Sequence, residues 1–341
     1  MSCAPRLSEH LDIALHSYSC RLRFLHEPGY DVLAFLDDAA ARGYTGVNLS
    51  LSGPDNDRLP PHRHLGGDSP EHLDAVTRRL AQHRLSVELD TDTVEPGRLA
   101  EALEIAERLG AQVLRTFTHH PYGPGLAAAT ERDLRAALPA AERTAVTIAL
   151  ENHEELTGPE LAGIARRIDH PRMRLLFDYG NGLPVLERPE DAFEAMRPWV
   201  AACHVKDVVL VAAEHVPEGV PAAAGVPLGQ GALDLAGLTR AVLATGLRRL
   251  CVQNVWGYHV PLGKLRPVDP ADPRLGHGTF AYAHPPHDPA RIAFDPEATL
   301  RAETCVTAER DALTATTEHA RRHLGPAGAA RSAISSSSPG A

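Results

Sequence analysis

The sequence predicts one α/β domain, a closed (β/α)8 TIM barrel with long loops after strands 7 and 8. Short apolar or β-branched runs alternate eight times with amphipathic helical stretches, which is typical of a parallel sheet covered by helices. Polar residues end at least four successive runs, as expected where barrel strands open onto an active site. A doubly wound sheet would also fit the alternation, but no GxGxxG or GxxxxGK[ST] motif follows the first strand. These observations favour the closed barrel.

The expected elements follow from periodicity and from helix end signals. Several helical stretches end at a glycine, and the stretch at 69–85 opens with Ser-Pro. Strands are expected at 12–18, 46–50, 86–90, 112–117, 146–151, 173–178, 200–207 and 249–254. Helices are expected at 32–44, 69–85, 97–111, 127–145, 157–169, 188–197, 234–246 and 297–324.

The expected organisation is an N-terminal extension at 1–10, the barrel at 11–325 and a disordered tail at 326–341 that is poor in bulky apolar residues. Two segments, 208–231 and 255–296, are predicted as long loops. Because loops of this length are usually lids or binding surfaces, 255–296 is expected to cover the site or to contact a partner.

Composition limits the class of protein. The net charge of −10 argues against a nucleic-acid partner, because such binding needs a basic footprint. No apolar run approaches the ~20 residues that span a bilayer, so no membrane partner is expected. The N-terminal residues lack a signal-peptide core, and the five cysteines form no CxxC pair and are interpreted as reduced. A cytoplasmic location is therefore expected.

Four residues with metal-ligating side chains close neighbouring predicted strands: Glu151, Asp178, His204 and Gln253. Alone, each has a plain explanation, such as a helix cap, an ion pair or a core histidine. Four at matching barrel positions instead favour convergence on one metal ion. Two carboxylates, an imidazole and an amide oxygen suit a hard divalent ion, with Mn²⁺ favoured over Mg²⁺ and Co²⁺. Such an ion would stabilise the enediolate of a carbonyl sugar.

Four segments carry a family resemblance: LENHEELTG, FDYGNGL, HVKDV and VPLGQGALDL. In this order they resemble the xylose-isomerase-like TIM-barrel superfamily, the sugar phosphate isomerase/epimerase group, over about residues 10–325. The resemblance implies a carbohydrate substrate and one divalent ion bound by Glu151, Asp178, His204 and a final glutamate, whose position is taken here by Gln253.

Gln253 changes the expected chemistry. In the family's epimerases, the first and last glutamates exchange a proton on opposite faces of the substrate, and an amide cannot act as a base. The substitution also removes one negative charge from the ligand set. Two-base epimerisation is therefore disfavoured. One-base chemistry is favoured: aldose–ketose isomerisation, or a lyase reaction such as decarboxylation of a 3-oxo sugar acid or β-elimination from a C-glycoside.

Other residues are candidates for the site. Glu151 or His153 is expected to be the base, although His153 also fits a substrate ligand or an ordinary loop residue. Asn181 fits substrate binding or turn formation equally well, and Asp207 is expected to orient a neighbouring group. Lys206, Arg115, His119 (beside His120), His16 and Trp256 are the remaining candidates for substrate contact. A non-catalytic carbohydrate-binding subunit stays open as an alternative, as do a homo-oligomer and a small companion subunit.

Overall fold

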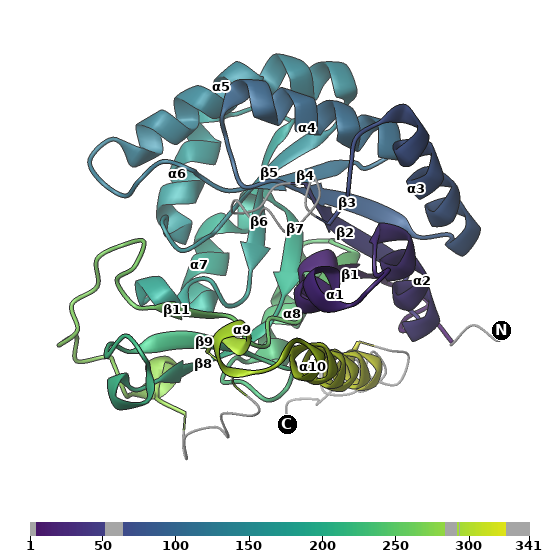
Figure 1. Ribbon diagram of the computed structural model, residues 1–341. Helices are drawn as coiled ribbons and strands as arrows, with labels where there is room; N and C mark the ends of the chain where they lie inside the picture. Colours follow the sequence, from purple (N-terminus) through teal and green to yellow (C-terminus); the bar gives the residue numbers. More distant parts are fainter. Residues whose placement is uncertain (1–4, 52–63, 284–291, 293, 325–341) are drawn as a thin grey trace, which may run out of the picture.

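Eight parallel strands close into a barrel in a computed structural model, which describes residues 5–51, 64–283, 292 and 294–324. The strand order around the barrel is β1-β10-β7-β6-β5-β4-β3-β2, and β1 pairs with both β2 and β10 (Figure 1). The predicted fold is confirmed. The barrel strands are β1 (Asp12–His16), β2 (Gly46–Ser50), β3 (Ser86–Asp90), β4 (Val113–Thr116), β5 (Thr147–Glu151), β6 (Met173–Asp178), β7 (Val200–Val205) and β10 (Arg249–Val252).

Helices wrap the outer face of the barrel (Figure 1). Local signals fix their ends: the Asp31 side chain accepts the Ala34 N–H, Gly43 ends the first predicted helix at φ 91°, and Thr157 forms a capping box with Glu160. The helices are α2 (Val32–Arg42), α3 (Pro70–His83), α4 (Pro96–Leu109), α5 (Leu126–Thr144), α6 (Gly158–Ile168), α7 (Pro189–Met196) and α8 (Leu235–Ala244). Short 3₁₀ helices lie at Ser17–Cys20, Leu183–Val185, Arg197–Trp199, Ala213–His215 and Gly278–Phe280.

Strand alternation places the candidate site directly above an apolar plug inside the barrel. Ala149, Leu176 and Ala202 pack together there, with Val113 against them. Side chains two residues further along a strand point to the same side. Two residues beyond each plug residue stand Glu151, Asp178, His204 and Arg115, respectively. The carboxyl end of the barrel interior is therefore polar.

The two segments predicted as loops contain strands, which corrects that prediction. β8 (Asp207–Val211), β9 (Ala222–Val226) and β11 (His259–Pro261) form an antiparallel sheet outside the barrel (Figure 1). A Cβ built on Gly225 of β9 would lie 2.1 Å from the Val255 carbonyl oxygen. The glycine is therefore required where this sheet approaches the chain after β10.

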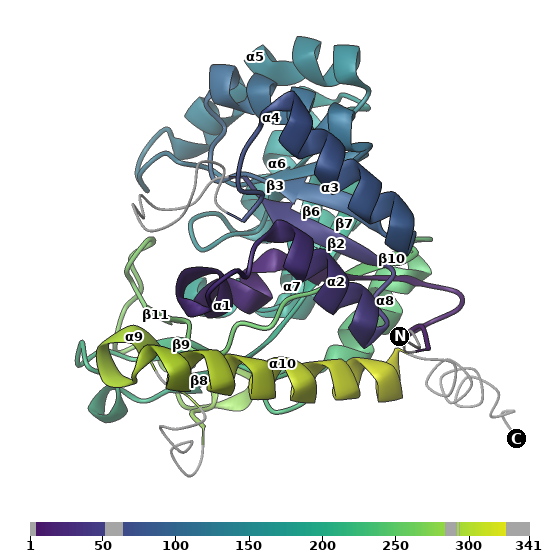
Figure 2. The same cartoon turned by 45° about the vertical axis from the view of Figure 1, so that its right-hand side comes forward.

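The C-terminal helix is shorter than predicted. It divides at Leu300–Arg301 into α9 (Pro296–Thr299) and α10 (Ala302–His323). Both views place α10 beside α1 (Arg21–His26), a short helix that the sequence reading missed (Figures 1 and 2). In the predicted N-terminal extension, Leu7 is fully buried and its N–H donates to the Gly43 carbonyl. The predicted disordered tail lies outside the described residues.

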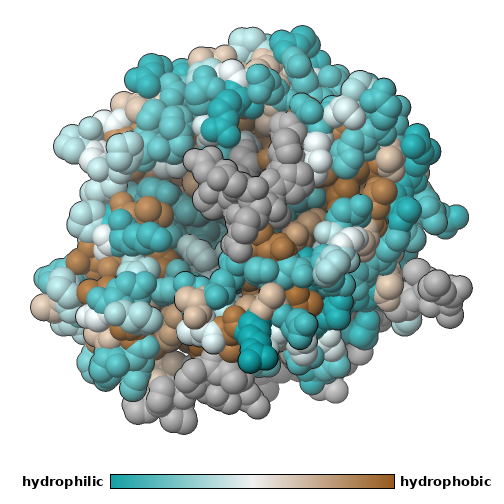
Figure 3. All heavy atoms as spheres, in the orientation of Figure 1, coloured by the Kyte–Doolittle hydropathy of each residue, from teal (hydrophilic) through white to brown (hydrophobic). Residues whose placement is uncertain are grey.

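The visible surface is largely hydrophilic, with hydrophobic residues in smaller groups (Figure 3). Within the described ranges, no helix combines the length and apolar character needed to cross a bilayer.

Candidate metal centre and active site

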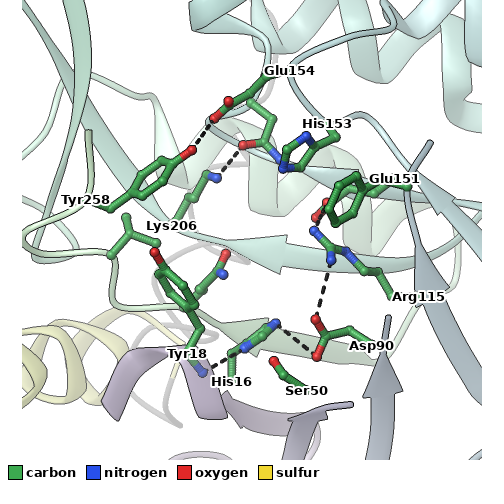
Figure 4. Close-up of a pocket in the computed structure, with 14 residues that line it drawn as sticks. His16, Tyr18, Ser50, Asp90, Arg115, Glu151, His153, Glu154, Lys206 and Tyr258 are labelled. Carbon is green, nitrogen blue, oxygen red and sulfur yellow. Dashed lines mark hydrogen bonds and ion pairs between the residues drawn. The ribbon is translucent and has the colours of Figure 1, made fainter. Parts of the chain in front are cut away.

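The carboxyl ends of the barrel strands surround a small pocket of about 120 Å³ (Figure 4). This volume is below the ~300 Å³ typical of sites for drug-sized ligands, which favours a small molecule. The barrel strands and the residues just after them supply His16, Ser50, Asp90, Arg115, Glu151, Lys206 and Gln253. Side chains from other segments complete the lining: Tyr18, Phe117, His153, Glu154, Asn181, Val255 and Tyr258.

Glu151, Asp178 and His204 converge as predicted. One potential ligand atom from each lies within 4.8 Å of the others, and all three residues are buried. Glu151 Oε1 and His204 Nδ1 are 3.0 Å apart, and Asp178 pairs with His204 in the register of β6 and β7. Asn152 fixes the strand ends, because its side chain accepts the Asp178 N–H and donates to the Asp178 carbonyl.

Two atoms of this triad are suited to metal coordination. His204 Nε2 and Asp178 Oδ2 are buried without a hydrogen-bond partner among the described residues. The other Asp178 oxygen accepts the N–H groups of Gly180 and Asn181 at 2.8 and 3.1 Å. Leaving a buried acceptor unsatisfied costs about 1–3 kcal/mol. Coordination to an ion would remove that cost.

Gln253 lies immediately after β10 and lines the pocket. Its N–H donates to the Val205 carbonyl at 2.9 Å, which fixes the residue beside the end of β7. The structure therefore places Gln253 near the triad, while the role of its side-chain amide as a fourth ligand stays a prediction.

Arg115 contacts the triad itself, a role that the sequence reading did not foresee. Its guanidinium donates to Glu151 Oε2 and, at 3.4 Å, to Asp90 Oδ2. Burial opposes ionisation of Glu151, but Arg115 and His204 outweigh it and hold the pKa of Glu151 below its ordinary value. Such a carboxylate is a better ligand than base.

His153 has the surroundings of an oriented proton carrier. Its Nδ1 lies 2.9 Å from Glu155 Oε2, and its ring stacks on Phe117 with centroids 4.0 Å apart. Burial works against the imidazolium, but the Glu155 carboxylate outweighs it and raises the pKa of His153. The ring is thus fixed by two neighbours at the pocket wall.

Lys206 and Asn181 both line the pocket and contact each other. The Lys206 ammonium donates to Asn181 Oδ1 and lies 3.3 Å from Asp178 Oδ1. Asp207 faces away from this pair. Its carboxylate accepts the N–H groups of Gly229 and Gly231, both at 2.9 Å, and so anchors the turn before α8.

Of the remaining residues predicted to contact substrate, one lines the pocket and two do not. His16 lines the pocket, and burial lowers its pKa well below the ordinary value. Trp256 does not line the pocket and instead packs with Leu22 and Cys305. His119 also lies outside the lining, because its Nδ1 turns to the Val94 N–H at 3.3 Å.

His119, His120 and Asp133 form a second group with metal-ligand spacing. His120 Nε2 is already 2.8 Å from Asp133 Oδ2, and His119 Nδ1 accepts a backbone N–H. The buried triad, with its two unpartnered atoms, fits an ion better than this rim group.

Several residues of the pocket lining were not predicted from the sequence, among them Asp90, Glu154, Tyr18 and Tyr258. Asp90 could have been found, because it ends its strand as Glu151 and Asp178 do. Glu154 accepts the Tyr258 hydroxyl at 2.8 Å, a contact between residues 104 positions apart that no local pattern indicates.

The sequence profile of the family described as "Xylose isomerase-like TIM barrel" matches residues 36–275. The chain belongs to this family. Two curated relatives match in part. An uncharacterized protein of Escherichia coli K12, YihM, is 24% identical over 202 residues, which are 59% of this chain and 60% of the relative. The 3-oxo-isoapionate decarboxylase of Pectobacterium atrosepticum is 27% identical over 143 residues, 41% of this chain and 50% of that enzyme. The chain thus matches about half to three-fifths of these relatives' lengths.

Solved structures share the fold at low identity. D-psicose 3-epimerase, crystallised in the presence of D-fructose, superposes with a TM-score of 0.59 at 11% identity over 89% of this chain and 97% of that one. The IolI protein with a bound zinc atom superposes with a TM-score of 0.57 at 15% identity, over 90% of this chain and 99% of that one.

Proposed function

We propose that this protein is a divalent-metal-dependent enzyme that converts a sugar or keto-sugar derivative through an enediolate, as sugar isomerases and epimerases do. The observation that carries the proposal is the buried triad, whose His204 Nε2 and Asp178 Oδ2 face no partner among the described residues. Glu151, Asp178, His204 and Gln253 would hold the ion, with Mn²⁺ favoured. The bound ion supplies Lewis-acid stabilisation of negative charge that develops on substrate oxygen.

The protein's own residues then divide the remaining work. Glu151 is paired with Arg115 and serves as a ligand rather than as a base. His153 moves the proton through Nε2, while Glu155 holds Nδ1 and Phe117 holds the ring plane. Lys206 and Asn181, which are bonded to each other in the pocket lining, orient substrate oxygens.

A lyase on the same scaffold is the second candidate, either a 3-oxo-sugar-acid decarboxylase or a C-glycoside β-eliminase. It is favoured by Gln253, which cannot return a proton on the opposite face of the substrate. The similarity to 3-oxo-isoapionate decarboxylase supports the same direction.

Metal content tests the site. Glu151→Gln and His204→Ala should each lower the Mn²⁺ content of the purified protein sharply by elemental analysis. His119→Ala is the matched control, since it removes an imidazole from the rim group and should leave the content unchanged. Full occupancy in both triad variants would refute the assignment.

Chemistry is tested separately with a panel of oxo-sugars and oxo-sugar acids in D₂O, followed by NMR. The Mn²⁺-loaded protein should incorporate deuterium next to the carbonyl of its substrate, and His153→Gln should not. Efficient C3 epimerisation of free ketoses would contradict the one-base proposal.

A further inference from the structure

Both candidate carboxylate ligands are already paired with a buried cation. Arg115 donates to Glu151 Oε2, and Lys206 Nζ lies 3.3 Å from Asp178 Oδ1. Arg115 and Lys206 are only 8% and 7% exposed. A metal ion must therefore share each carboxylate with a cation, which weakens its attraction to the site.

The charges of this cluster do not balance once an ion is present. Asp90, Glu151 and Asp178 contribute −3, while Arg115 and Lys206 contribute +2, so the buried cluster carries −1. A divalent ion changes this to +1. A glutamate at position 253 would restore neutrality, but the amide of Gln253 does not. An uncompensated buried charge is costly, so a monoanion that enters with the ion is favoured.

The neighbouring charges do not supply this anion to the cluster. Glu155 is paired with His153, and Glu154 accepts the Tyr258 hydroxyl at 2.8 Å. Figure 4 places Glu154 and Tyr258 together at one edge, with Arg115 and Asp90 across the pocket from them. The Glu154 charge therefore lies across the pocket from Arg115.

Arg115 is the better seat for a carboxylate. Its two terminal nitrogens donate to Asp90 and Glu151, but its Nε–H is buried without a hydrogen-bond partner in the described part of the chain and is a charged donor for a carboxylate oxygen. The Lys206 ammonium is a point charge that already donates to Asn181.

We propose that the site binds a sugar derivative bearing one carboxylate, seated on Arg115, and that this carboxylate and the divalent ion bind cooperatively. This inference rests on the proposed function and specifies its substrate class as a sugar acid. The ligand's carboxylate replaces the charge that Gln253 lacks. Because binding free energies are reciprocal, each ligand raises the affinity for the other by the same factor.

The test measures Mn²⁺ affinity by isothermal titration calorimetry in three polyol solutions. D-Gluconate is the carboxylate probe, D-glucitol its neutral match and D-glucitol 6-phosphate its phosphate match. None carries an aldehyde or ketone group, so none is turned over through an enediolate. Mn²⁺ complexation by each polyol in buffer is measured separately and subtracted. We expect gluconate to tighten Mn²⁺ binding by about tenfold or more, and glucitol by less than twofold.

Arg115→Gln should tighten Mn²⁺ binding without polyol and abolish the gluconate effect, while circular dichroism checks the fold. Lys206→Gln is the second variant and should reduce the effect partly. Three results would overturn this inference without contradicting the metal site. They are an unchanged Mn²⁺ affinity in gluconate, an undiminished gluconate effect in Arg115→Gln, and a larger increase in Mn²⁺ affinity with D-glucitol 6-phosphate than with gluconate. Absence of Mn²⁺ binding under every condition would overturn the proposed function as well.

Discussion

Glu309 of α10 offers a quantitative test of the packing that holds the N-terminal side of the molecule. Its carboxylate is fully buried and accepts the N–H groups of Leu22 and Arg23 at 2.9 and 3.0 Å, at the start of α1. The Arg21 guanidinium lies 3.8 Å away and also donates to the Trp256 carbonyl. One carboxylate thus links the C-terminal helix to α1.

Burial raises the pKa of Glu309 from 4.5 to about 7. The folded state therefore binds a proton more tightly than the unfolded state, and folding stability falls as pH rises from about 4.5 towards 7. The full shift in the pKa of Glu309 corresponds to about 3.4 kcal/mol of folding free energy. Roughly 2.5 kcal/mol of this is lost between pH 5 and pH 8.

Glu309→Gln keeps the shape of the side chain and removes its titration. Urea unfolding of the wild type and this variant at pH 5 and pH 8 isolates the effect, because other titrating groups cancel in the difference. The wild type should lose about 2.5 kcal/mol relative to the variant between these pH values. A difference that is independent of pH, or that favours the wild type at pH 8, would refute the reasoning.

Three further substitutions test other contacts. Gln253→Glu should tighten Mn²⁺ binding by roughly tenfold, because it adds a negative charge at the ion, and should slow the native reaction. Calorimetry measures the affinity and steady-state kinetics the rate. An unchanged Mn²⁺ affinity would place residue 253 away from the ion. Gly225→Ala should destabilise the fold by about 1–3 kcal/mol in urea unfolding, because its Cβ would meet the Val255 carbonyl; a neutral effect would mean that the outer sheet shifts freely. Tyr258→Phe should cost about 1–2 kcal/mol of stability through loss of the Glu154 contact, and an equal midpoint in both proteins would show that the hydroxyl is not bonded there.

The barrel and its triad were predictable because both depend on local pattern. Apolar strands with polar ends give the topology, and strand ends of a closed parallel barrel must meet. The pairing of Arg115 with Glu151 was not predictable in the same way, because it needs the β4–β5 register, in which Arg115 aligns with Ala149. β9 of the outer sheet escaped detection because alanine and glycine dominate it, and neither favours strands strongly. α1 spans only six residues and depends on Glu309 from the far end of the chain.

A single residue separates barrel strand β7 from strand β8 of the outer sheet. β7 ends at Val205 and β8 begins at Asp207, so Lys206 alone links the two strands. The barrel holds one side of that residue, and the turn gathered by the Asp207 carboxylate holds the other. The outer sheet therefore sets the reach of the ammonium group towards Asp178. A change in how that sheet packs, even far from the pocket, is therefore expected to change the distance between the Lys206 ammonium and Asp178 in the candidate metal site.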